Sequence, residues 1–243
     1  MAPEKKNEAA LAGLHALAAR GADVVMDDRE PWRIGGIDPD SVRDAAVLIL
    51  FGVLDDVPAR SRDSGAQQVG EDLDVLIVVR ADTLRQHAGQ PAFPGGKVDP
   101  VDHEAENPMV EAALREAVEE TGLDRSGVTV LGTLAPVPLP VSNFMVTPVL
   151  GWWTSPSEVD VVDTAESAQV FRVPVRDLTN PQHRYYATVT RGRSTYKSPA
   201  FEVPSVDGTV TIWGFTGVVL DRVFHELGWD EPWDRKRRKP API

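Results

Sequence analysis

The chain has 243 residues, of which 42% are hydrophobic and 26% charged, and its formal net charge is −12 at pH 7. This length and composition indicate a globular protein with one sizeable core, and the acidic balance disfavours nucleic acid and anionic membranes as partners of the whole chain. The absence of cysteine excludes disulfides, thiolate nucleophiles and cysteine-ligated zinc, and favours a cytoplasmic location.

Residues 1–40 predict a helical extension ahead of the main domain. Residues 7–20 place Ala and Leu at helical spacing, and charges interrupt the stretch, so it lacks the apolar centre of a signal peptide. The longest apolar run, residues 45–54, has ten residues. A membrane-spanning helix needs about twice as many, so we predict no membrane span.

Short apolar stretches, partly β-branched, predict the strands of the main domain. In chain order they are 45–54, 74–80, 128–134, 146–153, 170–175, 185–190, 200–203 and 210–213. Two segments with Pro and polar residues, 55–72 and 135–143, predict loops. A last helix is predicted over 217–227, ended by Gly228, and the basic tail 230–243 is expected to be a disordered, solvated end.

A further helix is predicted in the middle of the chain. Asn107 is a suitable N-cap, Pro108 is tolerated in the first turn, and Gly122 predicts the end. Its apolar stripe consists of Val110, Leu114, Ala117 and Val118. Strands interspersed with one central and one terminal helix indicate an α/β sandwich, in which a mixed β-sheet lies between helical layers.

The central helix carries three glutamates on one face. Glu116, Glu119 and Glu120 lie within about 100° of arc, and each like-charged pair at these spacings costs about 0.2–0.5 kcal/mol. Arg115 can pair with Glu119, but one guanidinium cannot neutralise three acids. Mg²⁺ or Mn²⁺ can, because these hard cations prefer oxygen ligands.

The approach to this helix supports the same interpretation. Residues 93–96, FPGG, combine an apolar anchor with a rigid turn and two residues without Cβ, so backbone carbonyls can come close to a ligand. Together with 115–123, REAVEETGL, this turn resembles the motif of the Nudix hydrolases. The resemblance implies an αβα sandwich with a mixed β-sheet, which we place over 41–229.

The resemblance also implies a metal-dependent pyrophosphatase. The implied metal ligands for Mg²⁺ or Mn²⁺ are Gly95, through its carbonyl, and Glu116, Glu119 and Glu120. Arg115 completes the implied catalytic set, in which it would orient Glu119. The general base stays open between a glutamate of the helix and one of the acidic loop, where Glu166 is preferred to Glu158.

Residues upstream of the turn resemble the coenzyme A pyrophosphatase branch of this family. A strand ends in Arg80, and Arg85, Gly89 and Phe93 follow at that branch's steps, while 213–217, WGFTG, resembles it downstream. The resemblance implies that these four single residues bind substrate. Forked guanidinium donors suit the 3′-phosphate and the pyrophosphate of coenzyme A, whose expected products are 3′,5′-ADP and 4′-phosphopantetheine.

The segment between Gly96 and Arg115 is longer than the family pattern. The family's isolated glutamate falls on Asp102 when counted forward from Gly96, and on Asn107 when counted back from Arg115. Since Asn107 starts a sound helix, we place the extra length in loop 97–106 and give none of its acids a role.

Alternatives remain at the level of function. The motif reads only a pyrophosphate, so ADP-ribose, a dinucleotide or a nucleoside triphosphate could replace coenzyme A as substrate. A Nudix-like ligand-binding regulator without turnover is a second alternative, which the intact Arg115, Glu116, Glu119 and Glu120 disfavour. We expect a small-molecule nucleoside diphosphate derivative as partner, neither nucleic acid nor membrane, and leave a homodimer open.

Overall fold

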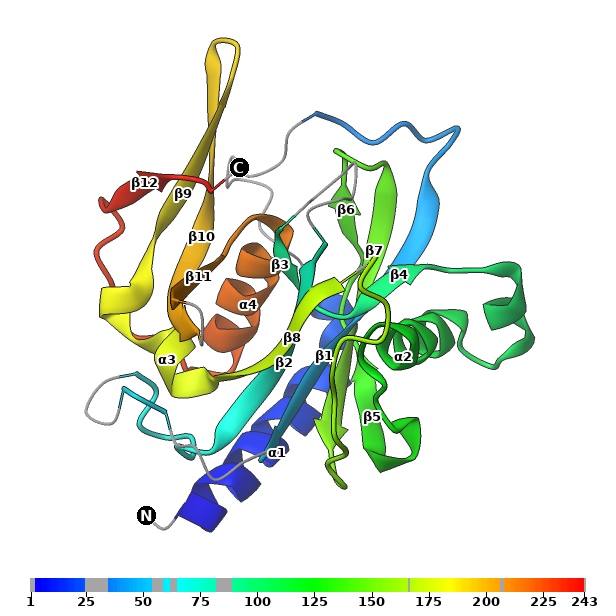
Figure 1. The fold of residues 1–243 in the computed structure, drawn as a ribbon, viewed down its shortest axis with the longest axis horizontal. Coiled ribbons are helices and arrows are strands. Elements are labelled where there is room, and N and C mark those ends of the chain that lie inside the picture. The colour runs from blue at the N-terminus through cyan, green and yellow to red at the C-terminus, as the bar shows by residue number, and fades with distance from the viewer. Residues whose placement is uncertain are drawn as a thin grey trace.

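The computed structural model describes residues 3–24, 35–53, 59–61, 65–81, 89–165, 167–205 and 208–242 (Figure 1). The strands of its main sheet are β1 (Arg43–Val53), β2 (Leu73–Arg80), β3 (Pro91–Ala92), β4 (Gly95–Lys97), β5 (Val128–Thr133), β6 (Val137–Leu139), β7 (Phe144–Trp153) and β8 (Ser167–Pro174). Their order is β3-β2-β1-β7-β5, with β4 paired to β1, β6 to β7 and β8 to β2. The β1–β7 pair is parallel and the others are antiparallel, so the sheet is mixed.

A smaller second sheet and four α-helices complete the described fold. The strands are β9 (Arg184–Arg191), β10 (Ser194–Ser205), β11 (Gly208–Ile212) and β12 (Arg238–Pro240), in the order β11-β10-β9-β12. The helices are α1 (Pro3–Ala19), α2 (Pro108–Thr121), α3 (Val175–Thr179) and α4 (Gly214–Glu226). Short 3-10 turns lie at Gly21–Asp23, Pro100–Glu104, Arg125–Gly127 and Pro181–His183.

Strand β1 lies at the centre of the main sheet, and helices cover both of its faces. Successive side chains of a strand point to opposite faces. Ile49 and Phe51 contact a core shared with α1 and α4, whereas Leu48 and Leu50 contact a core shared with α2. Figure 1 shows α2 and α4 on opposite sides of the sheet. The predicted αβα sandwich with a mixed sheet is therefore confirmed, and the double burial explains why β1 is an almost continuous apolar run.

All predicted strands exist, and one of the two segments predicted as loops contains a further strand. In the Pro-rich segment, β6 pairs with β7, and Pro138 stands opposite Met145. An edge strand tolerates proline because one side of its backbone needs no partner. In the segment 55–72, Ala66 and Val69 are fully buried, although their neighbours are polar. The partners of β9, β10 and β11 also differ from expectation, since they form a separate sheet.

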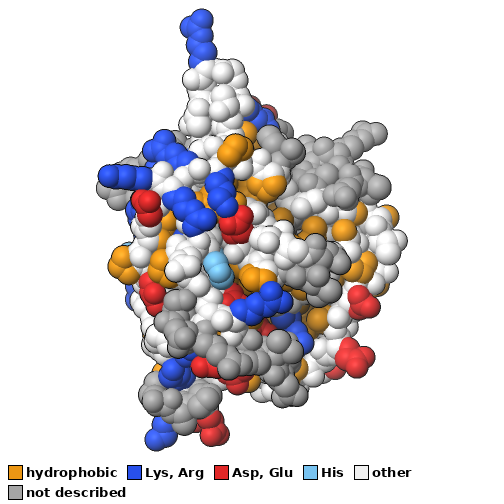
Figure 2. All heavy atoms as spheres, turned by 60° about the vertical axis from the view of Figure 1, so that its left-hand side comes forward, with side chains coloured by type: hydrophobic (Ala, Val, Ile, Leu, Met, Phe, Trp, Pro, Cys, Tyr) orange, Lys and Arg blue, Asp and Glu red, His pale blue; other side chains and the backbone are white. Residues whose placement is uncertain are grey.

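The basic tail 230–243 was predicted to be disordered, but its described part is ordered. Strand β12 runs parallel to β9, and the Trp233 ring lies 5.0 Å from that of Tyr186. Lys239 Nζ pairs with Glu202 at 2.7 Å. Figure 2 shows several Lys and Arg side chains gathered on this face, below the projecting hairpin. The tail is ordered because its cations contact aromatic rings and an acid on the second sheet. The local sequence does not reveal these contacts.

Helix α1 packs on the body of the protein. Its Leu14 and Leu17 are fully buried in the core that α4 also shares. Within the described residues, no helix combines the length and the apolar character needed to cross a bilayer.

Candidate active site

The Gly-Gly turn is held tightly between β1 and α2. Gly95, with φ of 154°, stands opposite Val47, and Gly96 stands opposite Ala46. A Cβ on Gly95 would come within 2.3 Å of the Ala46 carbonyl oxygen, and one on Gly96 within 2.4 Å of Glu116 Cδ. At Gly95 the clash is with backbone, so only a residue without Cβ fits beside β1; at Gly96 it is with the end of the Glu116 side chain, which would have to move.

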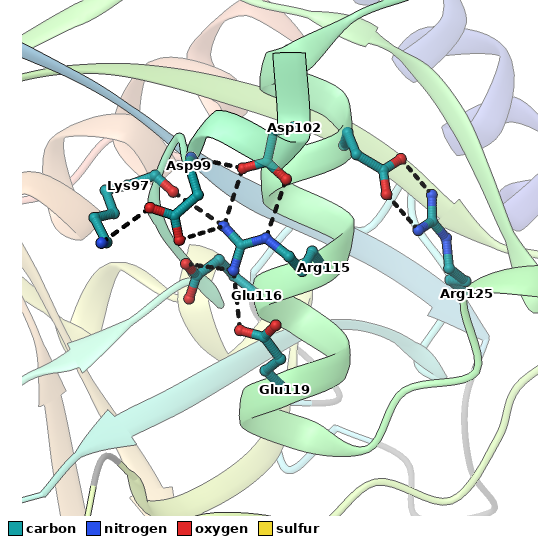
Figure 3. A network of polar contacts seen from close by, with 8 residues as sticks. Lys97, Asp99, Asp102, Arg115, Glu116, Glu119 and Arg125 are labelled. Atoms are coloured by element: carbon teal, nitrogen blue, oxygen red, sulfur yellow. Dashed lines mark hydrogen bonds and ion pairs between the residues drawn. The ribbon is translucent and has the colours of Figure 1, made fainter. Parts of the chain in front are cut away.

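Helix α2 begins and ends where the sequence predicts. The Asn107 side chain accepts a hydrogen bond of 3.3 Å from Val110 N, and Gly122 ends the helix with φ of 69°. Arg125 donates two bonds of 2.7 Å to the Glu111 carboxylate, which ties the first part of α2 to the segment after it (Figure 3). The lengthened segment before α2 therefore leaves the helix intact.

Arg115 is the hub of the polar network on α2 (Figure 3). Its Nη1 donates to Glu116 Oε1 and to Glu119 Oε2, each at 3.0 Å. Its Nε and Nη2 donate to the two oxygens of Asp102 at 3.0 and 3.1 Å, and Nη2 also donates to the Lys97 carbonyl at 3.1 Å. These contacts hold the pKa of the Arg115 guanidinium above its usual range, mainly through the bonds to Asp102. The predicted orienting role of Arg115 requires a direct contact with Glu119, and the bond from Nη1 is such a contact.

Asp102, which the sequence left unassigned, belongs to the network around Arg115. Asp102 is fully buried, and its side chain accepts a hydrogen bond of 2.7 Å from Asp99 N in addition to the two from Arg115. The Arg115 hydrogen bonds hold the pKa of this carboxyl below its usual range, although burial alone would raise it. Counting forward from Gly96 reaches this residue, so that count would have found it.

Glu120 contacts both the turn and the strand that precedes it. Its Oε2 accepts a bond of 3.0 Å from Gly95 N, and its Oε1 lies 3.9 Å from Arg80 Nη1. Glu120 is only 4% exposed, whereas the Arg80 side chain is 32% exposed, so the Arg80 end of the pair is open to water. Glu120 therefore links the α2 acids to the first arginine of the upstream motif.

The three glutamates share one face of α2, but their carboxylates do not converge on one point. Within the described part of the chain, no three acidic or histidine side chains are gathered closely enough to form a metal site. Arg115 donates hydrogen bonds to one oxygen of Glu116 and one of Glu119, while Glu120 accepts a hydrogen bond from Gly95 N–H. The structure therefore places the three glutamates on one helix without gathering their carboxylates.

The donor set nevertheless fits a hard divalent cation. Carboxylate and carbonyl oxygens are the ligands that Mg²⁺ and Mn²⁺ prefer. Acidic side chains outnumber basic ones in this network, so negative charge remains in excess. The acids are Asp99, Asp102, Glu116, Glu119 and Glu120, and the bases are Arg80, Lys97 and Arg115.

A cavity of about 670 Å³ lies in front of the turn. One part of its lining comes from the main sheet and its loops: Ala45, Val47, Arg80, 90–93, 95–97, 139–142, Phe144 and Val146. The other part comes from β9 and the start of α4, through 189–191 and 213–216. Most of these side chains are apolar, and the charged ones are Arg80, Lys97 and Arg191.

The predicted substrate-binding residues are distributed unevenly around this cavity. Arg80 and Phe93 line it, but Phe93 is only 2% exposed and packs mainly into the core. Gly89 does not line it; with φ of 66°, its N–H donates to the Arg80 carbonyl at 3.0 Å. Arg85 and the general-base candidate Glu166 lie outside the described residues.

The site thus combines an acidic helix, a glycine turn and a cavity large enough for a small molecule, and comparison identifies the family. The NUDIX domain matches residues 63–191, more than half of the chain. The chain therefore belongs to the Nudix family. It is a hydrolase of phosphorus anhydrides in nucleoside diphosphate derivatives, and such enzymes generally use divalent ions such as Mg²⁺ or Mn²⁺.

Two sequence relatives agree with this assignment. The chain is 35% identical over 154 residues to the Nudix hydrolase NudL of Yersinia enterocolitica, which covers 63% of this chain and 73% of the relative. It is 42% identical over 154 residues to NudL of Yersinia pestis strain Pestoides F, with 63% and 72% covered. Both relatives are described as uncharacterized. A looser likeness is to a Nudix hydrolase of M. smegmatis, RenU, with 26% identity, 57% and 77% covered, and a TM-score of 0.39.

Proposed function

We propose that this Nudix hydrolase cleaves the diphosphate of coenzyme A or its thioesters into 3′,5′-ADP and 4′-phosphopantetheine. The observation that carries the proposal is that Arg80 and the Gly95–Gly96 turn line the same cavity, with Arg80 3.9 Å from Glu120. Arg80 belongs to the upstream motif that resembles the coenzyme A branch, and Glu120 belongs to the hydrolase motif. The residues proposed for substrate recognition and for hydrolysis therefore lie next to each other.

The proposed ligands of Mg²⁺ or Mn²⁺ are Glu116, Glu119, Glu120 and the Gly95 carbonyl. A divalent cation held there would supply positive charge to the diphosphate and would make a nearby water more acidic. The protein's part is to position these oxygens. Arg115 holds Glu116 and Glu119 at 3.0 Å each, and the Gly95 N–H holds Glu120.

Arg80 and Asp102 have supporting roles in this proposal. Arg80 presents a fixed charge with forked donors to the substrate phosphates. Like the three glutamates of α2, Asp102 does not line the cavity; it acts through Arg115 and is a positioning residue. The general base stays open, since Glu158 is an exposed side chain after β7 and Glu166 lies outside the described residues.

The proposal is tested by mass spectrometry of the products formed from an equimolar mixture of coenzyme A, an acyl thioester, ADP-ribose and a dinucleotide. With Mg²⁺ or Mn²⁺ present, we expect 3′,5′-ADP and phosphopantetheine species to appear first. Faster consumption of ADP-ribose or the dinucleotide would show that coenzyme A is not the preferred substrate. Tight calorimetric binding without any product, at saturating metal, would instead favour a ligand-binding regulator.

A further inference from the structure

The cavity has a second wall that the hydrolase motif does not supply. This wall is formed by 189–191 of β9, at the very end of the NUDIX match, and by 213–216 at the start of α4, which lie beyond it. In Figure 1 the β9–β10 hairpin and α4 lie on one side of the molecule, and β4, β6 and β7 lie on the other. A substrate in the cavity therefore meets residues from two different sheets.

Arg191 is the charged residue of this second wall. It ends β9, directly before the turn at Gly192 and Arg193, and it pairs in register with Ser194 of β10. Hairpin pairing fixes the backbone on both sides of the turn, so the position of Arg191 at the cavity is set by the sheet. The side chain is exposed and also lines the cavity.

Arg191 differs from the other two cations that line the cavity. Arg80 Nη1 lies 3.9 Å from Glu120, and Lys97 Nζ lies 2.9 Å from Asp99. Arg191 has no ion pair or hydrogen bond from its side chain to any residue in the described part of the chain. Its charge is therefore the one in the lining that no carboxylate of the described protein offsets.

An unpaired guanidinium in this place suits a phosphate group of the substrate. The chain has a net charge of −12, so an anionic substrate needs local cations to enter. A guanidinium binds phosphate through two parallel hydrogen bonds, which gives both charge and orientation. The remaining lining is mostly apolar, with Phe144, Trp213 and Phe215 among it, and suits the uncharged parts of a nucleotide.

We infer that Arg191 is a specificity-determining residue, which binds a second phosphate group of the substrate, apart from the diphosphate that is cleaved. The inference rests on the proposed function, because in coenzyme A that second group is the 3′-phosphate. Arg80 serves the cleaved diphosphate from the main sheet, and Arg191 selects for the additional phosphate from the second sheet.

The first test is calorimetric binding of 3′,5′-ADP and of 5′-AMP, two nucleotides that differ by the second phosphate. We expect wild type to bind 3′,5′-ADP at least about tenfold more tightly, which is the effect of one charge-assisted contact, and Arg191→Gln to lose most of that preference. Arg193→Gln is the matched control, because Arg193 is an exposed residue of the same hairpin that does not line the cavity. This control should keep the preference.

The second test compares kcat/KM for coenzyme A and for its form without the 3′-phosphate. The ratio of the two values should fall about tenfold in Arg191→Gln, mainly through KM, and recover in part in Arg191→Lys. No binding preference in wild type, or equal effects of the Arg191 and Arg193 changes, would overturn the inference. If wild type hydrolyses neither compound yet shows an Arg191-dependent binding preference, the coenzyme A activity fails and the role of Arg191 stands.

Discussion

Replacing Asp102 by Asn gives the sharpest test of the network around α2. The change preserves the shape of the side chain but removes its charge and turns an amide N–H₂ toward the Arg115 guanidinium. Asp102 is fully buried and accepts three hydrogen bonds, two of them from Arg115. Removing one partner of a buried ion pair costs about 3–5 kcal/mol. Because Arg115 keeps Glu116 and Glu119, we expect the lower end, a loss of about 3 kcal/mol in the free energy of unfolding.

The same contact predicts a dependence on pH. The pKa of Asp102 in the folded protein is lowered, mainly by the bonds from Arg115, and that of an unfolded Asp is about 3.9. A lowered folded pKa means that the stabilisation is complete well above about pH 4 and is lost as the pH falls through the folded pKa. The difference between wild type and Asp102→Asn should therefore be constant from about pH 6 to 8 and shrink below about pH 4.

Urea denaturation followed by circular dichroism measures both effects, with Asp99→Asn as the matched control. Asp99 contacts Lys97 at 2.9 Å and Arg115 at 3.8 Å with a side chain 31% exposed, so its replacement should cost less than about 1 kcal/mol. Turnover should fall about 10–100-fold in Asp102→Asn, since Arg115 loses its support. An Asp102→Asn protein as stable as the Asp99→Asn control would refute this reasoning.

Two further predictions concern the turn and the tail. Gly96→Ala places a Cβ 2.4 Å from Glu116 Cδ and must displace that side chain. We therefore expect turnover to fall at least about tenfold, while the thermal midpoint of unfolding changes by only a few degrees. Full activity of this variant would contradict the geometry. Trp233→Ala removes a ring 5.0 Å from Tyr186 and 4.9 Å from Arg184 Cζ, and should cost about 2 kcal/mol in urea denaturation and speed proteolysis of the tail. An unchanged midpoint and cleavage rate would show that the tail does not depend on this ring.

Local pattern was sufficient for much of the fold. The apolar run of β1 and the capping residues of α2 predicted elements that exist, because both depend on short-range chemistry. Strand partners were not predictable in this way. Separation of β9 and β10 into a second sheet, and addition of β12 to it, depend on contacts such as Trp233 with Tyr186, which lie far apart in the sequence.

The sequence predicts the helix that carries the candidate site better than the arrangement of its side chains. The spacing of Arg115, Glu119 and Glu120 specifies one helix face, but it does not specify which oxygen each side chain turns to a neighbour. Asp102 was not predicted because the two counts across the lengthened segment disagree. Only the folded segment, with its 3-10 turn at Pro100–Glu104, brings Asp102 to Arg115. No local signal marks Arg191, since it reaches the cavity through the packing of the second sheet.

The central claim is that the acids of α2 support metal-dependent cleavage of a diphosphate. Its most direct test is the turnover of coenzyme A by Glu120→Gln, measured against wild type in saturating Mg²⁺ or Mn²⁺. Gln keeps the size of the side chain and an oxygen for the Gly95 N–H, but it loses the charge. We predict a fall in kcat of about a hundredfold or more, with the fold retained. Metal-dependent turnover within a few-fold of wild type would contradict the account.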